Sequence, residues 1–181
     1  MQSWKTIARH TILERPPFLI VENHIVKLPD GQMISDWPWI ITPDYVDVVA
    51  ITDENTFLCF RQTKYGIDGT SLAPIGGYLE PNETPLAAAQ RELYEETGYE
   101  ALDWIDLGHY RVDANRGAGI GYFWLARRAH KVTEPNTDDL EEQTLLHLRQ
   151  PEIEMALARG EFKVMAWAAS VALAILHLRA D

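Results

Sequence analysis

The sequence predicts an α/β (α+β) protein with a mixed sheet, and two observations indicate this class. Runs of apolar, often β-branched residues, bounded by turn residues, recur along the chain. Helical segments occur both between these runs and at the end of the chain. A layered arrangement of sheet and helices buries the apolar faces of both. With 181 residues, 46% of them hydrophobic, the chain is long enough to form such a core.

The N-terminal part of the chain contains a predicted β-hairpin. An apolar run over 18–28 meets Pro29-Asp30-Gly31-Gln32 and resumes over 33–41. An Asp-Gly pair between two apolar runs is a strong hairpin signal. We therefore expect an N-terminal β region over 1–41, followed by a second domain over 42–181.

A helix is predicted from Pro85 to Thr97. Thr84 can cap its first turn, Pro85 suits its first position, and Gly98 suits its C-terminal stop. The other predicted elements rest on apolar periodicity and on Pro and Gly boundaries. They are strands at 45–52, 56–62, 103–111, 120–127 and near 144–148, and helices at 151–160 and 161–178.

The charge and the apolar segments exclude several functions. Sixteen Lys and Arg against 27 Asp and Glu give a net charge of −11, which disfavours binding to nucleic acid or to an anionic membrane. The longest apolar stretch, 164–178, is shorter than the roughly 20 residues that a membrane span needs. No apolar signal segment occurs in the first ten residues. We expect a soluble, cytoplasmic protein.

Three carboxylates lie on one face of the predicted helix. Glu92, Glu95 and Glu96 fall at i, i+3 and i+4, so they share an arc of about 100°. Like charges at this spacing repel one another, and a hard divalent cation such as Mg²⁺ would offset the repulsion. For the triplet alone, a solvated acidic face with Arg91 paired to Glu95 is the favoured interpretation, and the surrounding residues reverse this preference.

The residues around the triplet follow a fixed pattern. In order, they are Gly77, five residues, Glu83, seven residues, Arg91-Glu92-Leu93, one residue, Glu95-Glu96, one residue, Gly98 and the apolar Tyr99. At every defining position, this pattern resembles the box of the Nudix hydrolase superfamily.

The resemblance implies a fold, a reaction and a metal. Nudix proteins form an α/β/α sandwich and cleave diphosphate linkages with Mg²⁺ or Mn²⁺. By position, the metal ligands would be the backbone carbonyl of Gly76 and the side chains of Glu92, Glu95 and Glu96. By the same resemblance, Arg91 and Glu83 would orient and neutralise these carboxylates.

Hydrolysis also needs a general base for the attacking water. In the diphosphate-sugar hydrolases of this superfamily, the base often comes from an acidic loop after the box. The segment 138–142 is the acidic cluster in that part of this chain, and it points to Glu141 and then Glu142. A solvated loop without a catalytic role is the alternative for either residue.

Looser features resemble the ADP-ribose and ADP-sugar pyrophosphatase branch. In that branch the N-terminal strands exchange across a homodimer, and aromatic residues of this region sandwich the adenine. Trp37 or Trp39 could supply such a platform, since base stacking is worth about 1 to 3 kcal/mol; an apolar dimer core is the alternative. Arg61 ends a strand before the box, and Arg116 could reach phosphate or a distal sugar unless it lies in a plain surface turn.

The substrate stays open at this point. ADP-ribose specialists often carry a proline where this chain has 114–117, and a glutamate where it has 72–75. A nucleotide sugar such as ADP-ribose, yielding AMP and a sugar phosphate, is the leading expectation. The alternatives are NADH, a dinucleoside polyphosphate or a nucleoside triphosphate, or a Nudix module that binds a nucleotide sugar without cleaving it.

Overall fold

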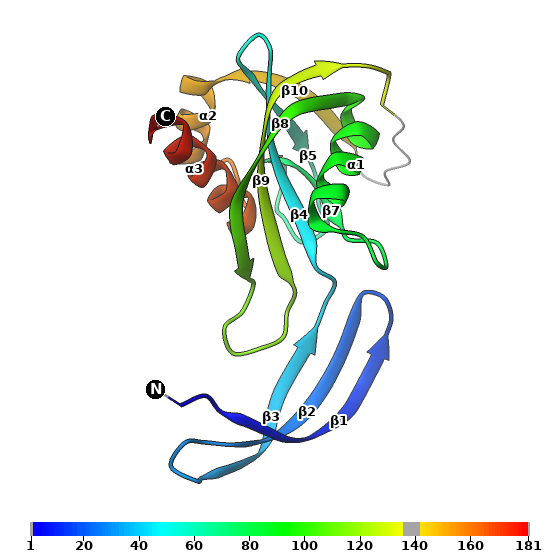
Figure 1. The fold of residues 1–181 in the computed structure, drawn as a ribbon, viewed down its shortest axis with the longest axis vertical. Coiled ribbons are helices and arrows are strands. Elements are labelled where there is room, and N and C mark those ends of the chain that lie inside the picture. The colour runs from blue at the N-terminus through cyan, green and yellow to red at the C-terminus, as the bar shows by residue number, and fades with distance from the viewer. Residues whose placement is uncertain (1, 136–141, 181) are drawn as a thin grey trace. The chain divides into compact units, whose positions relative to one another are not determined.

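The computed structural model describes residues 2–135 and 142–180, and its chain divides into two compact units. The N-terminal unit consists of the chain up to Asp44 together with residues 110–120. The central-sheet unit consists of residues 45–109 and the chain from Gly121 onward. Figure 1 shows the strands and helices of both units.

The N-terminal unit is a three-stranded antiparallel sheet in the order β1-β2-β3. Its strands are β1 (Lys5–Arg15), β2 (Leu19–Lys27) and β3 (Met33–Ile41). The predicted hairpin is confirmed as β2 and β3. Its turn contains Gly31 at φ 93°, a backbone conformation that glycine adopts without steric cost.

Strand β1 was not predicted from the sequence. Nearly all of its residues are exposed, so no buried apolar face marks it, and it is ordered by pairing with β2 along its whole length. Residues 110–120 complete the unit. Ala118 forms a parallel β-bridge with Thr42, and the amide of Ile120 donates to Asp44 Oδ1 at 2.8 Å.

The central-sheet unit contains a seven-stranded mixed sheet whose main path runs β10-β5-β4-β9-β8. Strand β4 is parallel to β9 and antiparallel to β5 and β7, while β6 pairs with β5. The strands are β4 (Tyr45–Thr52), β5 (Thr56–Gln62), β6 (Ser71–Ala73), β7 (Ile75–Tyr78), β8 (Tyr99–Arg111), β9 (Ile120–Lys131) and β10 (Gln143–Arg149).

Helices cover both faces of this sheet, which confirms the predicted α/β/α layers (Figure 1). Helix α1 (Pro85–Thr97) packs Ala88, Ala89 and Leu93 on one face. Helices α2 (Gln150–Ala158) and α3 (Met165–Ala180) pack on the other. Because strand residues alternate between faces, Val46 and Val48 face α1, whereas Val49 and Ile51 face α2 and α3.

The last helix begins later than the sequence suggested, at Met165 rather than near Glu161. The segment before it pairs with β6 instead. The carbonyl of Glu161 accepts the amide of Leu72 at 2.9 Å, and Ser71 Oγ accepts the amide of Lys163 at 3.0 Å. These bonds hold the segment in an extended path. Within the described residues, no helix has the length and apolar character to cross a membrane.

Candidate active site

Helix α1 positions the acidic residues of the box. Thr84 Oγ1 accepts the amide of Ala87 at 3.3 Å, and Pro85 occupies the first turn. At the other end, Gly98 has φ 73° and donates its amide to the Tyr94 carbonyl at 2.8 Å. The predicted bounds and caps of the helix are therefore confirmed.

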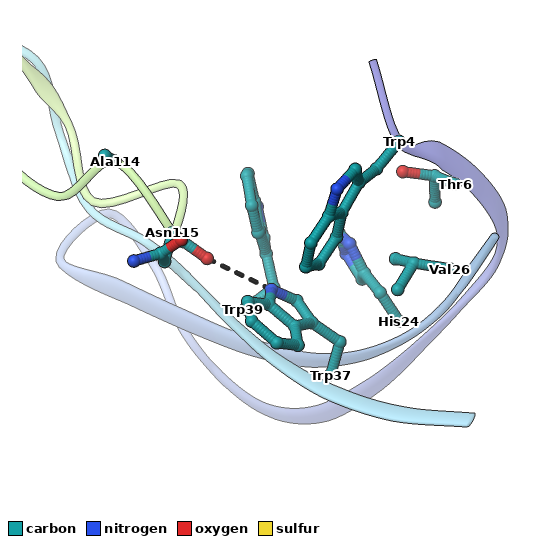
Figure 2. Close-up of a pocket in the computed structure, with 8 residues that line it drawn as sticks. All are labelled: Trp4, Thr6, His24, Val26, Trp37, Trp39, Ala114 and Asn115. Carbon is teal, nitrogen blue, oxygen red and sulfur yellow. Dashed lines mark hydrogen bonds between the residues drawn. The ribbon is translucent and has the colours of Figure 1, made fainter. Parts of the chain in front are cut away.

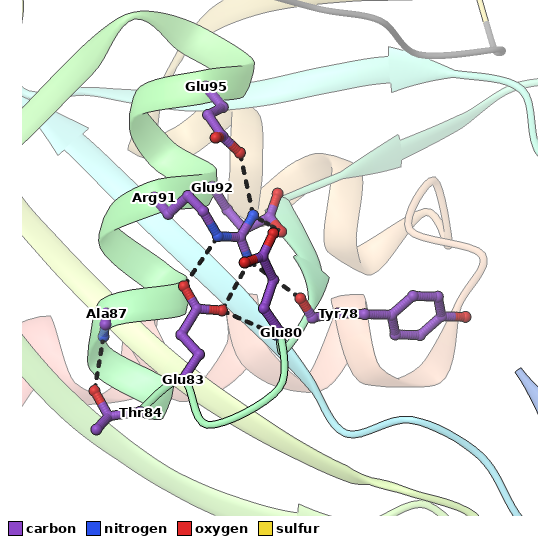
Figure 3. A network of polar contacts seen from close by, with 8 residues as sticks. All are labelled: Tyr78, Glu80, Glu83, Thr84, Ala87, Arg91, Glu92 and Glu95. Atoms are coloured by element: carbon purple, nitrogen blue, oxygen red, sulfur yellow. Dashed lines mark hydrogen bonds and ion pairs between the residues drawn. The ribbon is translucent and has the colours of Figure 1, made fainter. Parts of the chain in front are cut away.

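Arg91 is the centre of the acidic network (Figure 3). Its guanidinium forms a two-point ion pair with Glu83, with Nε–Oε1 at 2.9 Å and a second nitrogen to Oε2 at 3.0 Å. It also contacts Glu92 at 2.7 Å and Glu95 at 3.1 Å, and it donates to the Tyr78 carbonyl at 3.1 Å. One cation thus fixes three carboxylates and the end of β7. The Arg91–Glu95 pair is present, but it is only one contact of a larger network.

The network shifts the pKa values of its members in different directions. Hydrogen bonds from Arg91 hold the pKa of Glu83 below its usual range, and the pairing with Glu83 raises the pKa of Arg91. For Glu92, burial outweighs the Arg91 hydrogen bond and raises the pKa. Burial therefore destabilises the ionised form of Glu92, and a further cation nearby would stabilise it.

Two glycines bring strand β7 close to these carboxylates. A side chain at Gly77 would place its Cβ 2.1 Å from Glu92 Oε1, so only glycine leaves room for that carboxylate. The amide of Gly76 donates to Glu96 Oε2 at 3.2 Å. Strand β7 therefore lies against two of the three helix carboxylates.

A hard divalent cation would suit the predicted ligands, because the three helix carboxylates and the Gly76 carbonyl all offer oxygen atoms. In this structure, however, Arg91 occupies oxygens of Glu92 and Glu95. Within residues 2–135 and 142–180, no three His, Cys, Asp or Glu side chains come close enough to hold a metal ion. The glutamate side chains would therefore have to rotate to bind one ion together. Glu95 has room to rotate, because its carboxylate is half-exposed.

Asp47 is a further carboxylate beside the box, and it was not predicted from the sequence. It is 2% exposed, lies in β4 opposite Gly76, and places Oδ1 3.1 Å from where a Gly76 Cβ would be. Its Oδ2 is sealed from solvent without a hydrogen-bond partner. Burial raises the pKa of Asp47 to about 7.

The N-terminal unit holds an aromatic pocket of about 470 Å³ (Figure 2). Its lining residues come from all three strands, from the residue just before β1 and from the 110–120 segment: Trp4, Thr6, His24, Val26, Trp37, Trp39, Ala114 and Asn115. Trp37 Nε1 donates to the Asn115 carbonyl at 3.1 Å. The structure thus brings the two predicted tryptophans together, and it adds Trp4 and His24, which sequence reasoning missed.

The remaining predicted site residues are engaged elsewhere or lie outside the described chain. Arg61 pairs with Glu161 at 3.0 Å, and Arg116 pairs with Asp113 at 3.0 Å beside the aromatic pocket. Glu142 is exposed just before β10. Glu141 falls outside the described residues.

The fold and the site together define a class: an α/β/α domain whose acidic helix packs on a glycine-containing strand. The NUDIX domain family model matches residues 42–168, well over half of the chain. The chain therefore belongs to the NUDIX domain family, as the box predicted.

Individual proteins agree with this assignment. The chain is 30% identical to a protein named ADP-ribose pyrophosphatase from Bacillus subtilis (strain 168), over 97% of this chain and 92% of that one. It is 38% identical to the methanol dehydrogenase activator of Bacillus methanolicus, over 44% of each chain. A solved structure titled "Crystal structure of ADP compounds hydrolase" matches with a TM-score of 0.82 at 18% identity, covering 99% of this chain and 96% of that one. This last match supports the fold.

Proposed function

We propose that this protein is a divalent-metal-dependent hydrolase of the diphosphate linkage in a nucleoside diphosphate joined to a sugar. ADP-ribose, yielding AMP and ribose 5-phosphate, is the model substrate. The observation that carries the proposal is the intact box: Arg91 holds three carboxylates beside β7, and the Gly76 amide holds the fourth. The full-length similarity to a protein named ADP-ribose pyrophosphatase supports the choice of substrate class.

In this proposal some residues bind the metal ion and others orient the metal ligands. Glu92, Glu95, Glu96 and the Gly76 carbonyl would hold Mg²⁺ or Mn²⁺. When bound, such an ion stabilises charge on the diphosphate oxygens and lowers the pKa of water. Arg91 and Glu83 orient the carboxylates, because the two-point ion pair fixes the guanidinium and the guanidinium fixes Glu92 and Glu95.

A carboxylate must also take the proton of the water that attacks phosphorus, as the bridging P–O bond breaks. We assign this role to Glu141, with Glu142 as the second choice, on the family resemblance alone. Glu142 is exposed and so is accessible to water. A general base in hydrolytic enzymes contributes roughly 10²- to 10⁴-fold to the rate.

A substrate panel tests the proposed function. Purified protein with Mg²⁺, Mn²⁺ or EDTA is incubated with ADP-ribose, other nucleotide sugars, NADH, diadenosine polyphosphates and nucleoside triphosphates, and products are identified by chromatography. We expect metal-dependent release of AMP and ribose 5-phosphate from ADP-ribose. Preferred turnover of NADH, a dinucleoside polyphosphate or a triphosphate would assign another substrate of the family. Turnover of none, with binding of a nucleotide sugar, would assign a binding module.

The aromatic pocket of the N-terminal unit is the proposed platform for the nucleobase. Trp4 meets Trp37 edge to face, with ring centroids 5.1 Å apart, and Trp39 stacks on His24 at 5.0 Å. Several large π-faces in one cavity suit a flat aromatic ligand. Arg116, next to the lining residues Ala114 and Asn115, is the proposed contact for phosphate or sugar.

We also propose that the N-terminal unit mediates a homodimer. Strand β1 is an edge strand with almost every residue exposed, including Ile7 at 55% and Ile12 at 68%. Unpaired strand edges with apolar side chains favour pairing with another chain. Light scattering is expected to give twice the 20.6 kDa chain mass. A single species at the chain mass would rule out the dimer. The cytoplasmic location stays a prediction.

A further inference from the structure

His24 combines burial with a hydrogen bond and a ring stack in the aromatic pocket. It lies in β2 and is only 2% exposed, yet it lines the pocket (Figure 2). Its Nε2 lies 2.7 Å from Glu22 Oε2, and the Glu22 side chain is itself 14% exposed. Its ring is within 21° of parallel to Trp39. The imidazole is therefore fixed at both its nitrogen edge and its face.

The other ring nitrogen of His24 has no hydrogen bond within the described chain. Across the same residues, the polar side-chain atoms that are both sealed and unpartnered are Asp47 Oδ2 and Trp124 Nε1. His24 Nδ1 is not among them, so it is not sealed, and His24 itself lines the pocket. A rigidly held ring that lines the pocket therefore has one nitrogen without a hydrogen-bond partner.

Glu22 determines what that atom can do. An ionised carboxylate only accepts hydrogen bonds, so the hydrogen of a neutral imidazole lies on Nε2 and points to Glu22. Nδ1 then carries a lone pair and is an acceptor. In the pose that we propose, a base covers Trp39 beside His24, lies in the same layer as the imidazole, and presents its edge to Nδ1. An exocyclic amino group would satisfy that acceptor, whereas a carbonyl oxygen would oppose it.

We propose that His24, positioned by Glu22, selects a nucleobase with an exocyclic amino group at this edge, as in adenine, over one with a carbonyl there. This inference rests on the proposed function, because it takes the pocket to be the nucleobase platform. Glu22 is a positioning residue that acts through His24.

Calorimetric titration of the full chain in EDTA at pH 8.0 tests the inference without metal or turnover. The probes are AMP, purine riboside 5′-monophosphate, which has hydrogen in place of the amino group, and IMP, which has a carbonyl. Because one net hydrogen bond is worth roughly 0.5–1.5 kcal/mol, AMP is expected to bind about three- to tenfold more tightly than the unsubstituted purine nucleotide. IMP is expected to bind more weakly than either.

His24→Phe keeps a flat ring on Trp39 and removes Nδ1. This variant is expected to bind AMP and the unsubstituted nucleotide with affinities within about twofold of each other, with the affinity for the unsubstituted nucleotide unchanged. His109→Phe is the matched control, since His109 stacks on Tyr122 in the other unit, at 5.7 Å, and should leave the preference intact.

The possible outcomes distinguish the nucleobase platform from base selection by His24. If no nucleotide binds, the nucleobase platform is wrong, and with it this part of the proposed function. If all three nucleotides bind wild type equally, stacking stands and selection by His24 is overturned. Since that comparison uses wild type alone, it decides the matter even if His24→Phe does not fold. An amino-group preference that survives in a folded His24→Phe protein would also overturn the role of His24.

Discussion

Replacing Glu96 with Gln is expected to lower metal-dependent turnover by at least about a hundredfold while leaving the fold intact. Loss of residues that merely support metal ligands costs roughly 10- to 100-fold, so loss of a direct ligand charge should cost no less. A Gln side chain has the same size and can still accept the Gly76 amide through its carbonyl oxygen. The substitution therefore removes charge without removing the contact that ties α1 to β7.

The measurement is the initial rate on the best substrate of the panel, titrated with Mg²⁺ and with Mn²⁺, together with a thermal melt. Glu100→Gln is the matched control, because Glu100 is an exposed glutamate just beyond the box helix. It should keep the wild-type rate. A folded Glu96→Gln protein with wild-type rates would refute the assignment of Glu96 as a ligand.

The sequence predicted the box helix well because its signals are local. Thr84, Pro85 and Gly98 each act on the turn of helix next to them, and the structure shows each in that role. The three glutamates follow from helical spacing, so their common face was also predictable. The Arg91 network was predicted only in outline, since its contact with the Tyr78 carbonyl depends on how β7 packs against the helix.

Long-range strand pairing determines what the sequence did not show. Strand β1 has little burial of its own and depends on β2, so no periodicity marks it. The pairing of β1, β2 and β3 brings Trp4 and His24 together with the two predicted tryptophans. In the same way, Asp47 meets Gly76 only through the register of β4 with β7. Within the apolar run of β4, Asp47 gave no sign of either its partner or its burial.

Asp47 gives the second large expected effect, on stability. Its carboxyl is 2% exposed with Oδ2 unpartnered, and its pKa is raised from 3.8 to about 7. A raised pKa means that the folded state holds a proton more tightly than the unfolded state. This contribution to stability is fully present below about pH 3.8 and is lost as pH rises through about 7. Above pH 7 the folded protein carries a buried, unpaired charge.

Asp47→Asn removes that charge at nearly the same volume. The variant is expected to gain stability relative to wild type progressively between pH 5.5 and 8, with no further gain at higher pH. A shift of about three pKa units corresponds to at most about 4 kcal/mol. The new amide is also unpaired, which costs about 1–3 kcal/mol, so a net gain of roughly 1–3 kcal/mol at pH 8.5 is expected.

Guanidinium unfolding of both proteins in EDTA, from pH 5.5 to 9, measures this difference directly. Titrations of residues far from Asp47 cancel in the comparison, because both chains share them. Asp53→Asn is the matched control, since Asp53 is an exposed carboxylate in the turn that follows β4, and its stability should track wild type at every pH. A constant difference between Asp47→Asn and wild type across this range would show that Asp47 does not change its charge there. The folded protein would then carry an ionised Asp47 opposite Gly76 at all of these pH values, because a carboxyl that stayed protonated only in the folded state would make wild type steadily less stable as pH rises.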